Sequence, residues 1–313
     1  MRIESRRRPA VALVLWMLAG WAGCATFDRG KSLVPSKPSA RTGPFVIYSN
    51  TGASGEASAV RCLEALERDA GRELGFRPSA DQSPVEIYVL DSREDFDHFL
   101  RFYYPELPTR RAFFIAMGSQ RLVYTYASPR LDEDLRHEAT HAMLHGAFGE
   151  MPLWLDEGLA EYFETDRSDP GAERKRLELI AEDLARGWKP DLARLEAMAD
   201  IKQMTQRDYR ESWSWVRMML RGPEEGRTIL MEYLGEPERA GARIAPRLAA
   251  ARIDERALVA YLEGLRKPGG LAEKPAPAVT PASGSVRMQD GPEPPHRRTI
   301  RGFFHRIGFW IGF

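Results

Sequence analysis

The sequence predicts an α+β fold, in which a small mixed or antiparallel sheet is followed by a mostly helical half. Short runs rich in β-branched and aromatic residues lie between Phe45 and Tyr126. From Pro129 to Arg266 the apolar residues recur at helical spacing, and no internal repeat is seen. Strands and helices that are segregated along the chain in this way are typical of α+β domains.

The first elements follow from local patterns. The run Phe45–Tyr48 predicts a short strand, and Val85–Leu90 predicts a second strand because apolar and polar residues alternate there. A helix is expected over Gly55–Gly75, because apolar residues recur in it at helical spacing, namely Val60, Leu63, Leu66, Ala70 and Leu74.

A helix and a hairpin complete the first half. Asp91–Ser92 is a plausible N-terminal cap for a helix through Phe96 and Phe99. The β-prone runs Ala112–Ala116 and Arg121–Tyr126 are separated by a short connection that contains glycine, so we expect a β-hairpin.

The second half is expected to be helical and interrupted by prolines. Pro129 suits the first turn of its first helix, and Gly149 followed by Pro152 ends that helix. Further breaks are expected at Pro170, Pro190, Pro223 and Pro237.

Charge and cysteine content exclude some classes of protein. The chain has 313 residues, with 45 Lys and Arg against 45 Asp and Glu, so its formal net charge is zero. This balance leaves no basic excess to neutralise phosphates, so no nucleic-acid partner is expected. Cys24 and Cys62 are too few for a disulfide framework, and Cys62 is expected to be an unpaired, buried thiol on a helix.

Both ends are expected to lie outside the fold. Arginines precede an apolar stretch over Ala10–Gly23, and Trp21-Ala22-Gly23-Cys24 resembles the lipobox of bacterial lipoproteins, in which the cysteine is lipidated. The alternatives are a plain secretory signal cut near Ala22 and an uncleaved anchor. The expected location is therefore the bacterial cell envelope, after export and with a lipid on Cys24.

The C-terminal region differs in composition from the rest of the chain. It is rich in Pro, Ala, Gly and Ser, and it ends in a basic and aromatic tail that suits contact with anionic lipid headgroups. The alternative is that this tail docks onto its own domain or a partner. The predicted organisation is a lipoprotein-type signal peptide (1–23), a linker (24–44), a catalytic domain (45–266), a Pro-rich linker (267–295) and the tail (296–313).

One segment carries a metal-binding pattern. Residues 137–141 read His-Glu-Ala-Thr-His, and on a helix His137 and His141 share one face, so both imidazoles can reach a single metal ion. Glu138 is placed to take a proton from a metal-activated water. His145 lies another turn along and is a weaker candidate ligand. The alternative is a polar helix face that carries these histidines without a metal.

A hydrolytic zinc site needs a third protein ligand and an open position for water. A second predicted helix after Pro152 supplies two candidate carboxylates, Glu157 and Glu161, which lie four residues apart on one face. Either carboxylate is available as the third ligand, and the spacing from His141 to Glu157 is long enough for the first helix to end and the second to begin.

The two motifs together resemble those of the gluzincin metallopeptidases. His-Glu-x-x-His is followed at Trp154–Tyr162 by Trp-Leu-Asp-Glu-Gly-Leu-Ala-Glu-Tyr. Within that clan the chain is most similar to the bacterial peptidase-MA-like group of metallopeptidases. The likeness includes the strand Val85–Leu90 and the stretch Tyr209–Trp213, and it covers most of Phe45–Arg266.

The resemblance implies a site of known composition. By it, His137, His141 and Glu157 bind one zinc ion and Glu138 is the catalytic base. Glu161 then hydrogen-bonds a histidine and fixes its tautomer. Tyr209 is the candidate for stabilising the oxyanion, with Tyr162 and Tyr233 as weaker candidates and a purely packed ring as the alternative.

Three sequence details bear on this assignment. Asp156 replaces the asparagine that is frequent in the family, and the shorter spacing to Glu157 implies a tighter connection between the two helices. Leu144 and Ala147 stand where metzincins carry glycine and histidine, so that class is excluded. Arg121–Tyr126 is expected either to be an exposed edge that pairs with substrate backbone or to be ordinary hairpin structure.

The expected function is zinc-dependent hydrolysis, with a peptide or protein as the substrate. A rival from another class is a non-catalytic, zinc-stabilised envelope scaffold or binding protein. A base at Glu138 counts against the scaffold, because a purely structural zinc site needs none. A third possibility is a hydrolase that acts on an ester or on an amide other than a peptide bond.

Overall fold

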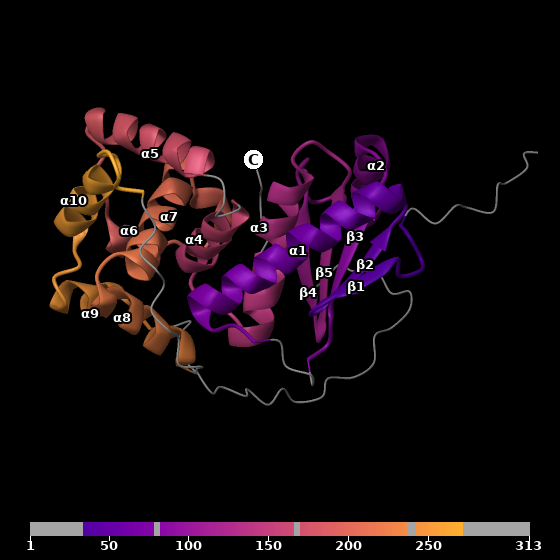
Figure 1. Cartoon of the computed structure of the whole chain (residues 1–313), viewed down its shortest axis with the longest axis horizontal. Coiled ribbons are helices and arrows are strands. Elements are labelled where there is room, and N and C mark those ends of the chain that lie inside the picture. The colour runs from indigo at the N-terminus through magenta and orange to yellow at the C-terminus, as the bar shows by residue number, and fades with distance from the viewer. Residues whose placement is uncertain (1–33, 78–81, 166–169, 237–241, 272–313) are drawn as a thin grey trace, which may run out of the picture. The chain divides into compact units, whose positions relative to one another are not determined.

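A computed structural model describes residues 34–77, 82–165, 170–236 and 242–271 and confirms the α+β class (Figure 1). The strands are β1 Ala40–Thr42, β2 Phe45–Ser49, β3 Val85–Leu90, β4 Phe113–Met117 and β5 Gln120–Tyr126. The helices of the first half and the site are α1 Gly52–Leu74, α2 Arg93–Tyr103, α3 Leu131–Phe148 and α4 Leu153–Glu164. The later helices are α5 Pro170–Ala185, α6 Leu192–Glu196, a 3₁₀ turn at Ile201–Gln203, α7 Gln206–Arg221, α8 Glu224–Gly235, α9 Ala245–Ala250 and α10 Glu255–Leu265.

The sheet is mixed and has the strand order β1-β2-β3-β5-β4. β2 with β3 and β3 with β5 are parallel, whereas β1–β2 and β4–β5 are antiparallel. The predicted hairpin is confirmed, and its turn uses Gly118 at a φ of 59°, which a glycine adopts without strain. β1 lies inside the span 24–44 that the sequence assigns to a linker, so the folded sheet begins before residue 45.

Of the two alternatives for Arg121–Tyr126, the exposed edge is wrong and ordinary hairpin structure is confirmed. β5 lies between β3 and β4, and all six of these residues are buried. The edge strand of the hairpin is β4 instead. A hairpin pattern shows that two strands pair with each other, but it does not show which of them pairs with the rest of the sheet.

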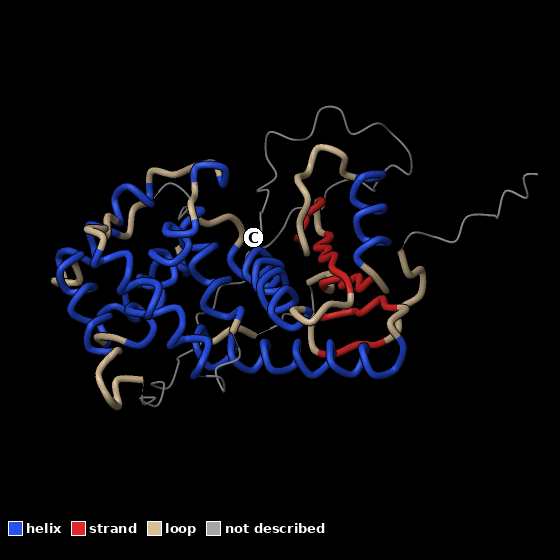
Figure 2. Tube along the Cα trace, turned by 90° about the horizontal axis from the view of Figure 1, so that it is seen from above, coloured by secondary structure: helices blue, strands red, loops and turns tan. Residues whose placement is uncertain are grey.

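Helices cover both faces of the sheet (Figure 2). Ile47, Ile87 and Val123 project from neighbouring strands into the core that contains residues of α1 and α3. On the opposite face, α2 packs its Phe99 ring 4.8 Å from the Tyr124 ring. The metal-binding motif therefore lies on a helix, α3, that is packed directly against the sheet.

The helical half is organised around α4 and α7, which make extensive contact with each other, while α4 also packs on α3. Pro152 and Pro223 precede α4 and α8, Pro170 begins α5, and Pro190 separates α5 from α6, as predicted. The break expected at Pro237 lies outside the described residues.

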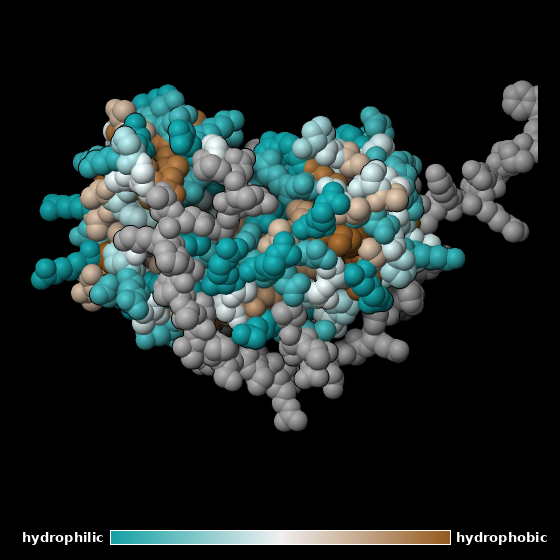
Figure 3. Space-filling view, in the orientation of Figure 1, coloured by the Kyte–Doolittle hydropathy of each residue, from teal (hydrophilic) through white to brown (hydrophobic). Residues whose placement is uncertain are grey.

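Polar side chains cover most of the face seen in Figure 3. None of the described helices is both long enough and apolar enough to cross a membrane.

A buried arginine joins three helices behind the motif. Arg136 is 3% exposed, its Nη2 lies 2.7 Å from Asp69 of α1, and its Nε donates to the carbonyl of Phe163 in α4 at 2.6 Å. Since Arg136 immediately precedes His137, these contacts fix the helix where the motif begins.

Replacing this arginine is expected to destabilise the fold. Arg136→Met removes one of the two arginines that contact Asp69, the other being Arg72, and it removes the donor to the Phe163 carbonyl, so we expect a loss of about 1–3 kcal/mol in the free energy of unfolding. Arg186→Ala is the control: its pair with Glu182 is exposed, so a change below about 1 kcal/mol is expected. Urea unfolding measures both, and equal losses for the two variants would contradict the structural role of Arg136.

Candidate metal centre and active site

The structure brings His137, His141 and Glu157 together. The two histidines lie one turn apart on α3, with ring centroids 5.2 Å apart, and Glu157 comes from the second turn of α4. One nitrogen of each histidine and one oxygen of Glu157 all lie within 4.8 Å of one another, and all three side chains are buried. This group can therefore hold a metal ion.

Glu157 provides the test of whether a metal fits. It is fully buried, and among the described residues neither of its carboxylate oxygens has a hydrogen-bond partner. Burial, together with the nearby charges of Asp156, Glu161 and Glu138, raises its pKa well above the ordinary range. An unpaired buried carboxylate is costly unless a cation satisfies it. The two imidazoles and this carboxylate match the donor set of a hydrolytic zinc site.

Both histidines contact a carboxylate with the ring nitrogen Nδ1. Glu164 Oε2 lies 2.9 Å from His137 Nδ1, and Asp156 Oδ1 lies 2.9 Å from His141 Nδ1. Such partners fix the tautomer and the ring orientation, and they leave Nε2 to face a metal. Burial also lowers the pKa of His137 to about 4, so its imidazole is neutral at pH 7, as a ligand must be.

The carboxylates at the histidines differ from the one that the sequence suggested. Glu161 was the expected partner, but Glu164 has that place at His137, whereas Glu161 pairs with Arg176 at 2.7 Å. The sequence spacing could have identified Glu164, because Glu157, Glu161 and Glu164 are at positions i, i+4 and i+7 and share one helix face. Asp156 was noticed only as a departure from the family pattern.

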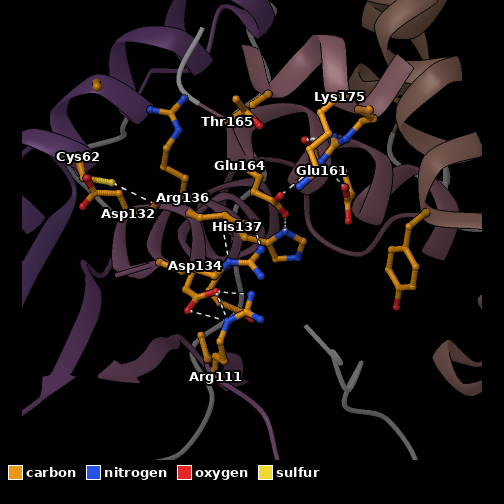
Figure 4. Close-up of a pocket in the computed structure, with 18 of the residues that line it drawn as sticks. Cys62, Arg111, Asp132, Asp134, Arg136, His137, Glu161, Glu164, Thr165 and Lys175 are labelled. Carbon is orange, nitrogen blue, oxygen red and sulfur yellow. Dashed lines mark hydrogen bonds and ion pairs between the residues drawn. The ribbon is translucent and has the colours of Figure 1, made fainter. Parts of the chain in front are cut away.

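A cavity of about 980 Å³ opens beside the metal-binding group (Figure 4). His137 and Glu138 contribute to its wall, together with Glu161, Glu164 and Tyr209. Glu138 is 2% exposed, and burial raises its pKa. A carboxylate in such surroundings, next to a metal ligand and facing a cavity, is suited to accept a proton.

Tyr209 is the tyrosine that the structure places at the site. It lines the cavity from α7, and burial followed by the charge of Glu157 raises its pKa, so the phenol stays protonated. The other two candidates lie elsewhere. Tyr162 accepts a hydrogen bond from Arg221, and the hydroxyl of Tyr233 donates to the carbonyl of Ala242.

The remaining sequence candidates also have places in the structure. His145 is half-buried and packs beside Phe114, with ring centroids 5.8 Å apart, outside the metal-binding group. Cys62 is buried on α1 and forms no disulfide with the described residues, as expected, and its thiol donates to the carbonyl of Asp132 at 3.4 Å. Sequence reasoning missed Arg110, which is 3% exposed and experiences the charges of Glu138 and Tyr209. No motif singles it out, because the fold alone brings its loop to α3.

Gly158 explains how α4 approaches α7 closely enough to place Glu157. A Cβ added at Gly158 would lie 2.7 Å from the carbonyl oxygen of Ser212 and 2.8 Å from Val216. The neighbouring atom at Ser212 is backbone and cannot swing away. The glycine after Glu157 is therefore required by the contact between the two helices.

Gly158→Ala is expected to separate α4 from α7. Overpacking of this kind costs about 1–3 kcal/mol, and metal binding should weaken because Glu157 moves with its helix. In Gly264→Ala, where nothing lies within 4 Å of the added Cβ, stability should rise by up to about 1 kcal/mol. Thermal unfolding and zinc titration of both variants test this. Unchanged zinc affinity in Gly158→Ala would contradict it.

Comparison with known proteins adds one family match. Residues 133–236 match a family model described as a protein of unknown function (DUF1570). The matched region runs from the first turn of α3 to the end of α8, so it contains His137, His141, Glu157 and Tyr209. The search of curated proteins found no match.

Proposed function

We propose that this chain is a zinc-dependent hydrolase, and specifically a peptidase. The observation that carries the proposal is the convergence of two imidazoles and an unpaired buried carboxylate beside Glu138 at a cavity wall. The resemblance to gluzincin metallopeptidases supports the same class. The match to a family of unknown function neither favours nor opposes it.

In this proposal His137, His141 and Glu157 would hold the zinc ion. Zinc, when bound, supplies Lewis acidity that activates water near neutral pH and polarises a carbonyl. Glu138 accepts a proton at its carboxylate from the water that attacks the peptide carbonyl carbon. It returns that proton to the leaving nitrogen when the C–N bond breaks. The hydroxyl of Tyr209 donates a hydrogen bond to the carbonyl oxygen as negative charge develops there.

A catalytic role explains more of the site than a scaffold does. Structural zinc sites are usually closed by four ligands, often cysteines, whereas the group here has three members and none is a cysteine. Glu138 lies on the cavity wall next to the group, a position that a scaffold would not require. Hydrolysis of an ester or another amide would use the same residues and is the second candidate.

We also propose that the protein is exported to the bacterial cell envelope and anchored through a lipid on Cys24. The basic and aromatic tail, 296–313, would add contact with anionic lipids. The signal segment, Cys24 and the tail all lie outside the described residues, so this proposal rests on the sequence.

Removal and return of the metal test the proposed activity. Purified protein should cleave members of a mixed peptide library, lose that cleavage after treatment with a chelator, and regain it when one equivalent of zinc is added. Thermal stability should follow the metal in the same way. Stability that depends on zinc, without cleavage of any peptide in the library or of any ester in a panel assayed beside it, would support the scaffold and contradict the hydrolase.

A further inference from the structure

We infer that Glu164 and Arg176 form a positioning pair for the metal centre: Arg176 of α5 holds Glu164 of α4, and Glu164 orients His137 of α3. This inference rests on the proposed function. It assigns a role in metal binding to a helix, α5, that carries none of the ligands.

The carboxylate of Glu164 is shared between two partners. Its Oε2 lies 2.9 Å from His137 Nδ1 (Figure 4). Its Oε1 lies 3.3 Å from Arg176 Nη2. The side chains of Glu164 and Arg176 are 16% and 15% exposed, and that of His137 is 7% exposed. The side chain of Glu133 is a further hydrogen-bond partner of this carboxylate. Because each oxygen contacts a different one of the two partners in a largely dry environment, the rotation of the carboxylate and the direction of the hydrogen bond to the imidazole are restricted.

Arg176 is itself held at several points. Its Nη1 donates to the backbone carbonyl of Glu161 at 2.8 Å, and its Nη2 lies 2.7 Å from the Glu161 carboxylate. The guanidinium also stacks over the ring of Trp213 in α7, 5.2 Å from its centroid. A planar group with fixed donors can satisfy all of these partners at once, which a lysine ammonium cannot do.

The guanidinium also explains the acidic residues near His137. His137, Glu161 and Glu164 form a second group whose ligand atoms lie within 4.8 Å of one another, as a second metal site would require. Arg176 already contacts both carboxylates of that group, so it supplies the compensating positive charge. The nearby Arg130 hydrogen-bonds Glu133, and its charge also acts on Glu164, but less strongly than that of Arg176.

The consequence for His137 follows from the chemistry of metal ligands. An imidazole whose Nδ1–H donates to a carboxylate presents Nε2 as the free base, and its basicity as a ligand increases. Loss of such a partner typically weakens metal binding by about 10–100-fold. Loss of Arg176 should act in the same direction, because the Glu164 carboxylate would lose the guanidinium that holds its rotamer and the larger of the two arginine charges that act on it.

Zinc competition with a chromophoric chelator and the visible spectrum of the cobalt-substituted protein test this pair. Glu164→Ala and Arg176→Met should each bind zinc about 10–100-fold more weakly, with an altered cobalt spectrum. Glu164→Gln keeps an acceptor for Nδ1–H and should recover part of the affinity. Arg176→Lys should remain weak. The control is Glu182→Ala, whose side chain is exposed on α5 and which should bind zinc as the wild type does.

The outcomes separate this inference from the proposed function. Wild-type affinity and an unchanged cobalt spectrum in Glu164→Ala would overturn the pair while leaving the metal centre in place. A role limited to joining α4 and α5 would lower the unfolding temperature without changing the cobalt spectrum, which also overturns the inference. If the wild type bound neither zinc nor cobalt, both the inference and the proposed function would be wrong.

Discussion

Glu138→Gln is expected to bind zinc as tightly as the wild type and to hydrolyse peptides about 10²–10⁴-fold more slowly. The amide has almost the same size and shape as the carboxylate, so the buried position on α3 tolerates it. It cannot accept a proton from the attacking water, because an amide oxygen is a very weak base. Comparison of kcat/KM with the zinc content of the same preparations measures the effect.

The matched control is Glu225→Gln, which makes the same change at an exposed position on α8 and should leave kcat/KM unchanged. Undiminished cleavage by Glu138→Gln would show that another residue, or none, moves the proton. A loss of zinc together with activity would show instead that Glu138 belongs to the ligand set.

Glu157→Gln is expected to be more stable than the wild type without zinc and less stable than the wild type with zinc. In the metal-free protein the buried carboxylate is unpaired, so its replacement by a neutral amide removes an unfavourable charge at pH 7. The free energy of unfolding of the metal-free variant should therefore be higher than that of the metal-free wild type at pH 7. With zinc at 1,000 times its Kd, the wild type gains about 4 kcal/mol, and the variant gains far less.

The pH dependence of the metal-free protein follows from the same carboxylate. Burial raises the pKa of Glu157 in the folded state, so folding favours the protonated form. Stability from this group is complete below its unfolded pKa, about 4.3, and is lost as the pH rises through the raised folded value. Chemical unfolding from pH 4 to pH 8 should therefore show a steeper loss for the wild type than for Glu157→Gln. Identical slopes would contradict an uncompensated charge at this position.

The sequence predicted the fold where the pattern is local. The helical spacing in α1, the alternation in β3 and the glycine turn between β4 and β5 each depend on neighbouring residues, and all three are confirmed. Strand order depends on contacts distant in sequence, so the sequence left open whether β5 is an edge strand. The three-residue strand β1 is too short to give a pattern.

The same distinction applies to the site. His137 and His141 are brought together by one helix turn, and their approach to Glu157 is confirmed. The partner of His137 depends on how α4 is rotated against α3, which a single sequence does not show. Arg176 and Arg110 reach the centre through packing of α5 and of the loop before β4, and no spacing rule identifies them.

Metal content is the most direct test of the whole account, measured by mass spectrometry on gel-filtered wild type, His141→Ala and Glu157→Ala. The account predicts close to one zinc ion per wild-type chain and almost none in either variant, although both variants should remain folded by circular dichroism. Zinc at equal stoichiometry in all three proteins, or in none of them after zinc loading, would contradict a metal centre built from these two helices.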